Sequence, residues 1–138
     1  MYATVDDMTA RFGHQELLEL TDTAMTGSAD VTAVLTALGD ATELVNGYVA
    51  ARYRVPLHPV PDMARRWCCD IARFYLHKVA VPDAVKAGHD TALQGLREVA
   101  RGVVQLQSAG LETTGATGGE TVLSVGGRTF TNDSMKGF

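Results

Sequence analysis

The sequence predicts a mainly α-helical protein. We expect a small helical bundle of three longer and two short helices, then a glycine-rich linker and a C-terminal arm that is a β-hairpin or an extended segment. Three long stretches between residues 31 and 106 repeat apolar side chains at intervals of three and four, the period of an amphipathic helix. With 46% hydrophobic and 20% charged residues among 138, the chain has the composition of a folded domain. Seven of the 14 glycines lie in the last 31 residues, so we divide the chain into a bundle at 1–107 and a linker with an arm at 108–138.

Two short helices are predicted at the start of the chain. Thr4 followed by Asp7 resembles a capping box, with aspartate in the place of glutamate, and predicts a helix that ends near Phe12. Residues 14–22 predict a second short helix, in which three leucines supply the apolar positions. Residues 23–30 are small and polar enough to predict a loop.

The first long helix is predicted to begin at Val31 and to carry one apolar stripe over about 25 residues. It cannot continue past Val55, because Pro56 disfavours a helical residue before it. Gly39 and Gly47 each cost about 1 kcal/mol relative to alanine inside a helix, so they predict the close approach of another backbone. The stripe consists of Val31, Val34, Leu35, Leu38, Ala41, Val45, Tyr48, Val49 and Arg52.

Prolines mark the starts of the next two helices. One begins at Pro61 or Asp62, after a connector that contains three prolines, and its apolar stripe reaches Val79. The other begins after Pro82 and ends near Leu106. Together with the first long helix they predict a bundle with one apolar core.

Five arginines fall close together in the middle of the sequence, and two interpretations of them are open. They can form a solvated face with ion pairs, since Asp70 has the spacing to pair with Arg66 and Arg73 on one helix. Alternatively they form a functional surface that faces a polyanion or an acidic partner subunit, without reading sequence, because no recognition-helix layout accompanies them. The five are Arg52, Arg54, Arg65, Arg66 and Arg73.

The residue types that carry chemistry are sparse. Cys68 and Cys69 are neighbours whose side chains point about 100° apart on a helix, so we interpret them as small buried or half-buried residues rather than a disulfide or a zinc site. The sequence has no glycine-rich phosphate loop and no nucleophile elbow. We therefore predict no enzyme, no cofactor and no metal. The histidines, which are scattered, are His14, His58, His77 and His89.

The net charge of −4 and the pI near 5.5 argue against a dedicated binder of nucleic acid or of an anionic membrane. The sequence shows no signal peptide and no run of about 18 apolar residues. We expect a protein made and used in a cytosol-like compartment, or carried out of it inside an assembly.

The last part of the chain combines a predicted linker with apolar side chains. Residues 108–120 have no helical or strand pattern, whereas the Gly126-Gly127 pair between two β-prone runs predicts a hairpin. A lone hairpin is marginal in water, so we expect it to bind another chain; the alternative is that it folds back on its own bundle. The predicted partner-binding residues are Val122, Leu123, Val125, Arg128, Phe130, Met135 and Phe138.

Four segments together resemble a known family. In order they are "MYATVDDMTARFGHQELLELTD", "VNGYVAARYRVPL", "CCDIARFYLH" and "FTNDSMKGF". They resemble the Mu-like phage family of small virion proteins, long described as a domain of unknown function, and the chain is similar in architecture to the head–tail connector (adaptor, or head-completion) proteins of tailed phages. The resemblance covers nearly the whole chain and is weakest between residues 108 and 120.

The resemblance implies a virion protein of the head–tail junction, made in the host cytoplasm. Its expected form is a homo-oligomeric ring of about twelve copies beneath the portal protein, which extends the channel for packaged DNA without sequence recognition. Its expected partners are the portal, gripped by the C-terminal segment, and a tail-side neck protein, a stopper or a terminator. The five arginines would then face the channel or the next subunit.

The sequence is also compatible with three alternatives to the connector. One is another neck or tail-completion protein with the same bundle. A second is a small cytosolic nucleic-acid-binding or regulatory module that uses the arginine cluster, which the acidic pI and the apolar tail disfavour. An enzyme, the third, would require a bound metal or a pocket.

Overall fold

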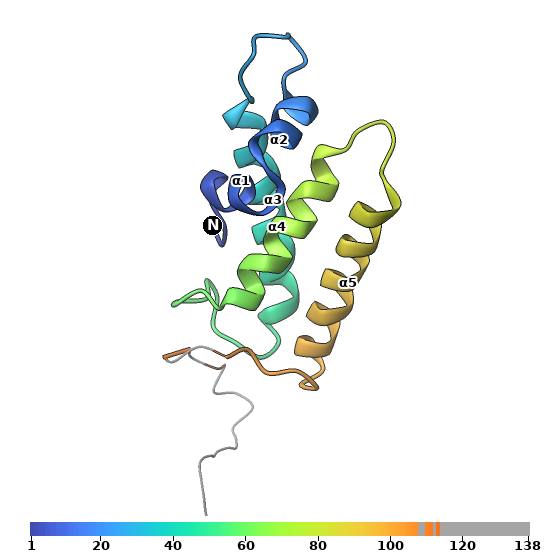
Figure 1. The fold of residues 1–138 in the computed structure, drawn as a ribbon. Helices are drawn as coiled ribbons and strands as arrows, with labels where there is room; N and C mark the ends of the chain where they lie inside the picture. Colours follow the sequence, from blue (N-terminus) through green and yellow to red (C-terminus); the bar gives the residue numbers. More distant parts are fainter. Residues whose placement is uncertain (108–109, 112, 114–138) are drawn as a thin grey trace, which may run out of the picture.

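The computed structural model describes residues 1–107, 110, 111 and 113, and in this part of the chain the protein is a mainly helical bundle of five helices (Figure 1). This confirms the predicted fold class and the predicted set of two short and three longer helices. The described residues contain no strand, only an isolated antiparallel bridge between Tyr53 and Thr113. The helices are α1 (Val5–Phe12), α2 (His14–Thr21), α3 (Val31–Val49), α4 (Asp62–Leu76) and α5 (Asp83–Ala100).

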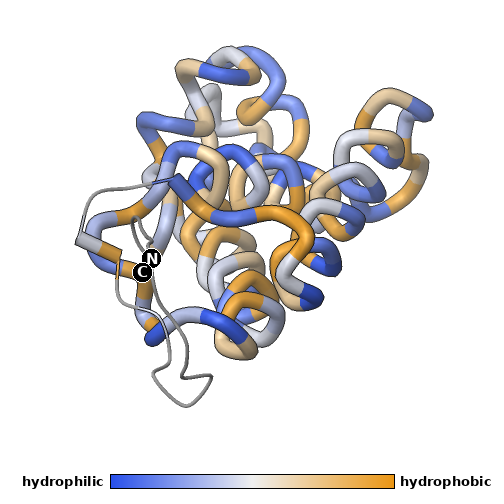
Figure 2. Tube along the Cα trace, turned by 90° about the horizontal axis from the view of Figure 1, so that it is seen from below, coloured by the Kyte–Doolittle hydropathy of each residue, from blue (hydrophilic) through white to orange (hydrophobic). Residues whose placement is uncertain are grey.

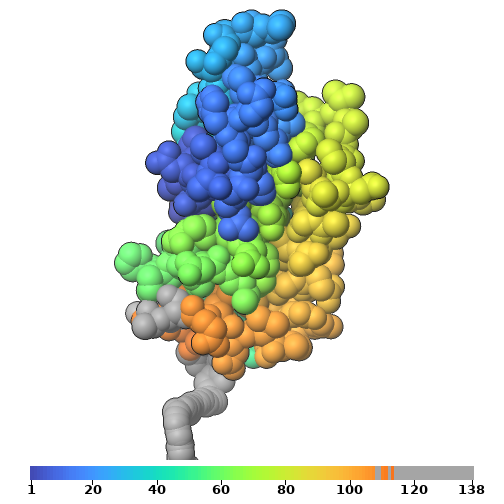
Figure 3. Space-filling model, viewed as in Figure 1, coloured from blue at the N-terminus to red at the C-terminus, as the bar shows by residue number. Residues whose placement is uncertain are grey.

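The helices form two layers. Helices α3, α4 and α5 run alternately up and down and pack against one another, while α1 and α2 cover one side of α3 and reach α4 (Figures 1 and 3). One apolar core joins the layers, because fully buried Met8 and Leu17 from the short helices share it with α3, α4 and α5. Its largest buried side chains in the long helices include Leu38, Ile71 and Leu96.

Local signals set the helix starts as the sequence predicted. Thr4 Oγ1 accepts a hydrogen bond from the Asp7 amide at 3.1 Å, and the Asp7 carboxylate accepts one from the Thr4 amide at 2.9 Å, so the capping box is complete. Asp30 caps α3 by accepting from the Ala33 amide. Pro61 stands at the N-cap position of α4.

The three long helices end earlier than predicted. Helix α3 stops at Val49, and so Arg52 lies beyond it, because the chain turns there to bury Tyr53 and Leu57 in the core. Helix α4 stops at Leu76, which leaves Val79 in the following loop with 99% of its side chain exposed. Apolar periodicity overestimated the length of these helices, because apolar residues of the following loops happen to continue the helical spacing.

Gly102, rather than a residue near Leu106, ends α5. Its φ of +81° is a left-handed conformation that favours glycine, and its amide donates to the Val99 carbonyl at 3.0 Å. The next amide, that of Val103, donates to the Glu98 carbonyl at 2.9 Å. These two bonds satisfy the last carbonyls of the helix, so the helix terminates at Ala100.

The predicted close approach at Gly39 and Gly47 is wrong. A Cβ at Gly39 would meet only the Met1 methyl at 4.0 Å, and one at Gly47 would meet nothing within 4 Å. The tight contact lies instead between α4 and α5, where a Cβ at Gly95 would stand 2.4 Å from the Trp67 ring. The indole therefore packs directly against the glycine of the neighbouring helix.

The lower end of the bundle is closed by two tyrosine hydroxyls. Tyr2 accepts a hydrogen bond from the Leu57 amide at 2.8 Å, and Tyr53 accepts one from the Leu106 amide at 2.9 Å. Figure 2 looks onto this end, where the segment after α5 passes across the helix ends. Leu111 packs against the core and Thr113 forms the bridge to Tyr53, so contacts with the bundle continue beyond residue 107. The predicted hairpin and arm lie outside the described residues.

Candidate functional site

The predicted site had two parts, and the structure describes one of them. All seven residues of the predicted arm, from 122 to 138, lie outside the described residues. The five arginines are described, and each can be placed by its contacts. Arg52, Arg65 and Arg73 bind groups within the same molecule.

Arg73 connects α4 to α2. Its Nε and Nη2 donate to the two carboxylate oxygens of Glu16 at 2.6 and 2.8 Å, and its guanidinium lies 4.4 Å from the centre of the Phe12 ring. Both partners of the ion pair are 26% exposed, so water screens the pair only in part. This geometry is that of a two-pronged clamp between helices.

The predicted ion pairs of Asp70 do not form. Among the described residues Asp70 has no ion pair within 4.0 Å, because Arg73 turns to Glu16 instead. Burial raises the pKa of the Asp70 carboxyl above its ordinary value, and the charges of Arg11, Arg66 and Arg73 offset only part of this effect. Helical spacing offered Asp70 as the partner of Arg73, but the tertiary structure brings Glu16 of α2 to Arg73 instead.

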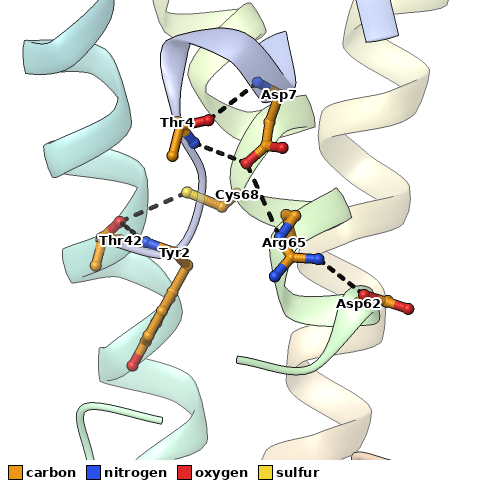
Figure 4. A network of polar contacts seen from close by, with 7 residues as sticks. All are labelled: Tyr2, Thr4, Asp7, Thr42, Asp62, Arg65 and Cys68. Atoms are coloured by element: carbon orange, nitrogen blue, oxygen red, sulfur yellow. Dashed lines mark hydrogen bonds and ion pairs between the residues drawn. The ribbon is translucent and has the colours of Figure 1, made fainter. Parts of the chain in front are cut away.

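Arg65 connects α4 to the capping box of α1. Its Nη1 donates to Asp62 at 2.8 Å, and its Nε lies 3.9 Å from the Asp7 carboxylate (Figure 4). The same Asp7 carboxylate accepts the Thr4 amide, so one side chain caps α1 and faces α4. Arg65 is therefore a contact between the two layers of the bundle.

Arg52 caps the C-terminal end of α5. Its Nε donates to the Ala100 carbonyl at 3.3 Å and its Nη2 to the Arg101 carbonyl at 3.1 Å. The end of a helix carries partial negative charge, so a guanidinium is well placed there. A Cβ at Gly102 would stand 2.7 Å from Nη2, so the small residue also makes room for the cap. The remaining two arginines, Arg54 and Arg66, are exposed.

A groove between α3 and α5 lies near the same end of the molecule. It is open and encloses about 310 Å³. Its two arginines, which were not among the predicted site residues, stand four residues apart in and just after the last turn of α5. Their spacing on the polar face was the signal that could have found them. The groove is lined by Tyr48, Gln94, Arg97, Ala100 and Arg101.

The two cysteines are buried and free, as predicted. Cys68 Sγ lies 3.5 Å from Thr42 Oγ1, which also accepts the Tyr2 amide at 3.2 Å (Figure 4). Burial raises the pKa of the Cys68 thiol, and it raises that of Cys69 to about 12. A thiolate is the reactive form of cysteine, so both side chains are unreactive packing residues at neutral pH.

The histidines contact different groups. His89 stacks on Phe74 with ring centres 3.9 Å apart, and His77 Nδ1 lies 3.0 Å from the Arg73 carbonyl oxygen. Among the described residues no group of three or more His, Cys, Asp or Glu side chains has the arrangement to hold a metal ion. None of the described helices combines the length and the hydropathy needed to cross a membrane.

Comparison with known proteins assigns the family. The chain matches the family described as "Bacteriophage Mu, Gp36" over residues 2–124. The protein belongs to the bacteriophage Mu Gp36 family. This confirms the resemblance to a Mu-like phage family that the four sequence segments indicated.

Two relatives of the Gp36 family member extend the comparison over most of its length. It is 27% identical over 138 residues to "Mu-like prophage FluMu protein gp36" of Haemophilus influenzae, covering 100% of this chain and 98% of that protein. It is 35% identical over 102 residues to "Gene product J" of Escherichia phage Mu, covering 73% of this chain and 72% of the relative. The chain is thus a phage protein of nearly the same length as its prophage relative.

Proposed function

We propose that this Gp36 family member is a structural virion protein, a head–tail connector that forms a ring under the portal, extends the DNA channel and links the capsid vertex to the tail. The observation that carries the proposal is the family match over residues 2–124, which joins the chain to proteins of phage Mu and a Mu-like prophage.

The closed lower end of the bundle supports this function. Tyr53 holds the backbone of Leu106 and pairs with Thr113, so the point from which the chain continues toward the arm is fixed on the bundle. Arg52 fixes the neighbouring end of α5. A connector needs such a base, because an arm that reaches a partner binds better from a defined starting point.

The arm is the proposed portal-binding element. Phe130, Met135 and Phe138 would fill apolar pockets on the portal, and Val122, Leu123, Val125 and Arg128 would add a strand to an exposed sheet edge. Each contact is weak because the segment must become ordered on binding, and a ring offsets this cost by repeating the contact around its circumference.

The exposed arginines have a place in the same proposal. Arg52, Arg54 and Arg66 are exposed on the bundle, so these three can face a neighbouring subunit or the phosphates of passing DNA. Arg65 and Arg73, which are half-buried, would support this surface through their contacts within the bundle.

The test is native mass spectrometry of the chain mixed with its portal ring. The full-length protein is compared with a version stopped after Thr121, and with Phe130→Ala/Phe138→Ala in the full chain. We expect binding in a fixed, ring-sized multiple that truncation abolishes and the double substitution weakens. Circular dichroism should show unchanged helicity in all three proteins.

Each other outcome changes a definite part of the proposal. Binding that survives truncation would keep the connector and move its grip to the bundle. Loss of bundle stability in the double variant would show that the two rings belong to the core. Absence of binding in every form, with DNA affinity that falls steeply with salt, would replace the connector by the nucleic-acid-binding alternative.

A further inference from the structure

The charges of this protein are divided along the chain. Residues 12–51, which form α2, the loop after it and α3, contain six acidic residues and no lysine or arginine. Residues 52–101 contain nine basic and five acidic residues. Two copies that met through the same patch would bring like charges together, whereas two different patches of opposite charge attract. The charge distribution therefore favours a head-to-tail contact between copies.

The loop between α2 and α3 presents an apolar side chain on the acidic part of the molecule. Met25 is 88% exposed and has a φ of +56°, an uncommon conformation for a residue other than glycine. Figure 3 shows the loop projecting from the upper end of the molecule. An exposed apolar residue that is held in a rare conformation is a candidate contact residue.

Hydrogen bonds hold this loop in place. One carboxylate oxygen of Asp22 accepts the Thr26 amide at 2.8 Å and the Thr26 hydroxyl at 2.9 Å, and the other accepts the Gly27 amide at 2.8 Å. The Asp30 amide donates to Thr21 Oγ1 at 2.8 Å, which fixes the far side of the loop. Met25 is thus displayed on a pre-ordered loop, which reduces the entropy that a contact would cost.

The groove between α3 and α5 has the matching properties, because its charged lining residues come from the basic part, 52–101. Tyr48 and Ala100 supply apolar walls, and among the described residues that line it the charged ones are Arg97 and Arg101. A volume of about 310 Å³ is enough for a methionine side chain with neighbouring atoms of its loop. An apolar side chain with acidic surroundings therefore fits it better than a phosphate backbone does.

The Met25 loop of one molecule cannot reach the groove of the same molecule. The loop precedes Val31 at one end of α3, and Tyr48 lies near the other end, 17 residues along. At a rise of about 1.5 Å per residue the two ends are about 26 Å apart. A Met25 loop that binds in this groove must therefore belong to another copy.

We propose that the Met25 loop of one copy docks in the groove of the next, with Arg97 and Arg101 facing the acidic residues around that loop, such as Glu19 and Asp30. The contact joins two different surfaces, so it repeats from copy to copy and closes into a ring when the rotation per step divides a full turn. The inference rests on the proposed connector function in its ring form, and it names the surfaces between subunits.

The test is disulfide trapping with two separate variants, Met25→Cys and Gln94→Cys. Both positions are exposed, and the native Cys68 and Cys69 are buried and compete little. Mixed under mild oxidation, the two variants should give one covalent heterodimer in far higher yield than either variant alone. Val79→Cys is the matched control for Met25→Cys, because this residue is 99% exposed in the other loop at the same end. A Val79→Cys protein that couples equally well to Gln94→Cys would overturn the proposal, as would no coupling by Met25→Cys.

Charge reversal sharpens the same test. Adding Arg97→Glu and Arg101→Glu to the Gln94→Cys copy should lower the yield of heterodimer by about tenfold at low salt, and neutral glutamines should lower it less. Unchanged helicity verifies that the variants fold, and an unchanged yield would contradict the role of the arginines. If trapping fails while portal binding succeeds, only the proposed contact between copies is contradicted. If trapping succeeds without portal binding, the connector function is contradicted and the contact between copies is retained.

Discussion

The two layers of the bundle are each stabilised by a different kind of interaction. In the layer of α3, α4 and α5, large apolar side chains such as Ile71 and Leu96 are fully buried, and the Trp67 ring lies against Gly95. The layer of α1 and α2 contributes a few apolar residues, but charged and polar groups fix its orientation through Arg73–Glu16 and the Asp7–Arg65 contact. We therefore expect changes in side-chain volume to destabilise the layer of α3, α4 and α5. Removal of a charge should instead weaken the contact of α1 and α2 with α4.

The largest expected effect is removal of the indole between α4 and α5. Trp67 is 7% exposed, so Trp67→Ala should lower the free energy of unfolding by about 3–5 kcal/mol. Urea denaturation followed by circular dichroism measures the loss. Met63→Ala, on the same helix at a residue that is 38% exposed, is the control and should cost far less. Equal costs for the two variants would mean that the indole contact contributes little.

Two glycine-to-alanine substitutions should change the stability of the protein in opposite directions. Gly95→Ala places a methyl group 2.4 Å from the Trp67 ring, so overpacking should cost about 1–3 kcal/mol in spite of the better helix propensity of alanine. Gly47→Ala meets nothing within 4 Å and should stabilise the protein by up to about 1 kcal/mol. Thermal unfolding of both variants is the measurement. If both substitutions raise the melting temperature, α4 and α5 are not in tight contact.

The charged clamp between the layers should have a smaller effect. A double-mutant cycle with Arg73→Ala and Glu16→Gln should give a coupling of about 1–2 kcal/mol, since the pair is two-pronged and partly buried. The coupling should decrease in high salt. Arg66→Ala, which removes an exposed arginine from the same helix, serves as the control. Strictly additive effects of the two substitutions would show that the clamp does not hold α2 against α4.

The smallest effect concerns the partly buried carboxyl of Asp70. Its pKa is raised in the folded protein, mainly by burial, so the ionised form is disfavoured by folding. Below the ordinary pKa of an aspartate the carboxyl is protonated and its burial does not reduce the stability of the protein. As the pH rises through the raised pKa of the folded state, burial of the ionised carboxylate lowers the free energy of unfolding. Asp70→Asn should therefore raise the melting temperature at pH 7 and have little effect at pH 3. A lower melting temperature at pH 7 would mean that attraction to the nearby arginines outweighs burial.

The elements that the sequence predicted correctly depend on interactions between residues near one another along the chain. The capping box of Thr4 and Asp7 is closed within a single turn, and Pro61 and Pro82 stand directly at the starts of α4 and α5. Burial of Cys68 and Cys69 was predictable because small apolar residues on a core-facing helix have few other places to go. The family could be recognised for a related reason, since its matching segments include these same elements.

The sequence by itself therefore determined the number of helices, their starts, most of the apolar positions that form the core, and the family; Val31 and Leu35 of the predicted stripe are exposed instead. The tertiary structure alone decided where α3 ends, which glycine admits a neighbour, and that Arg73 binds Glu16 rather than Asp70. It alone brought Tyr48 beside Arg97 and Arg101 to form a groove. The physical reason is range: periodicity and capping act within a turn or two of helix, whereas the partner of a long side chain depends on which distant segment packs beside it.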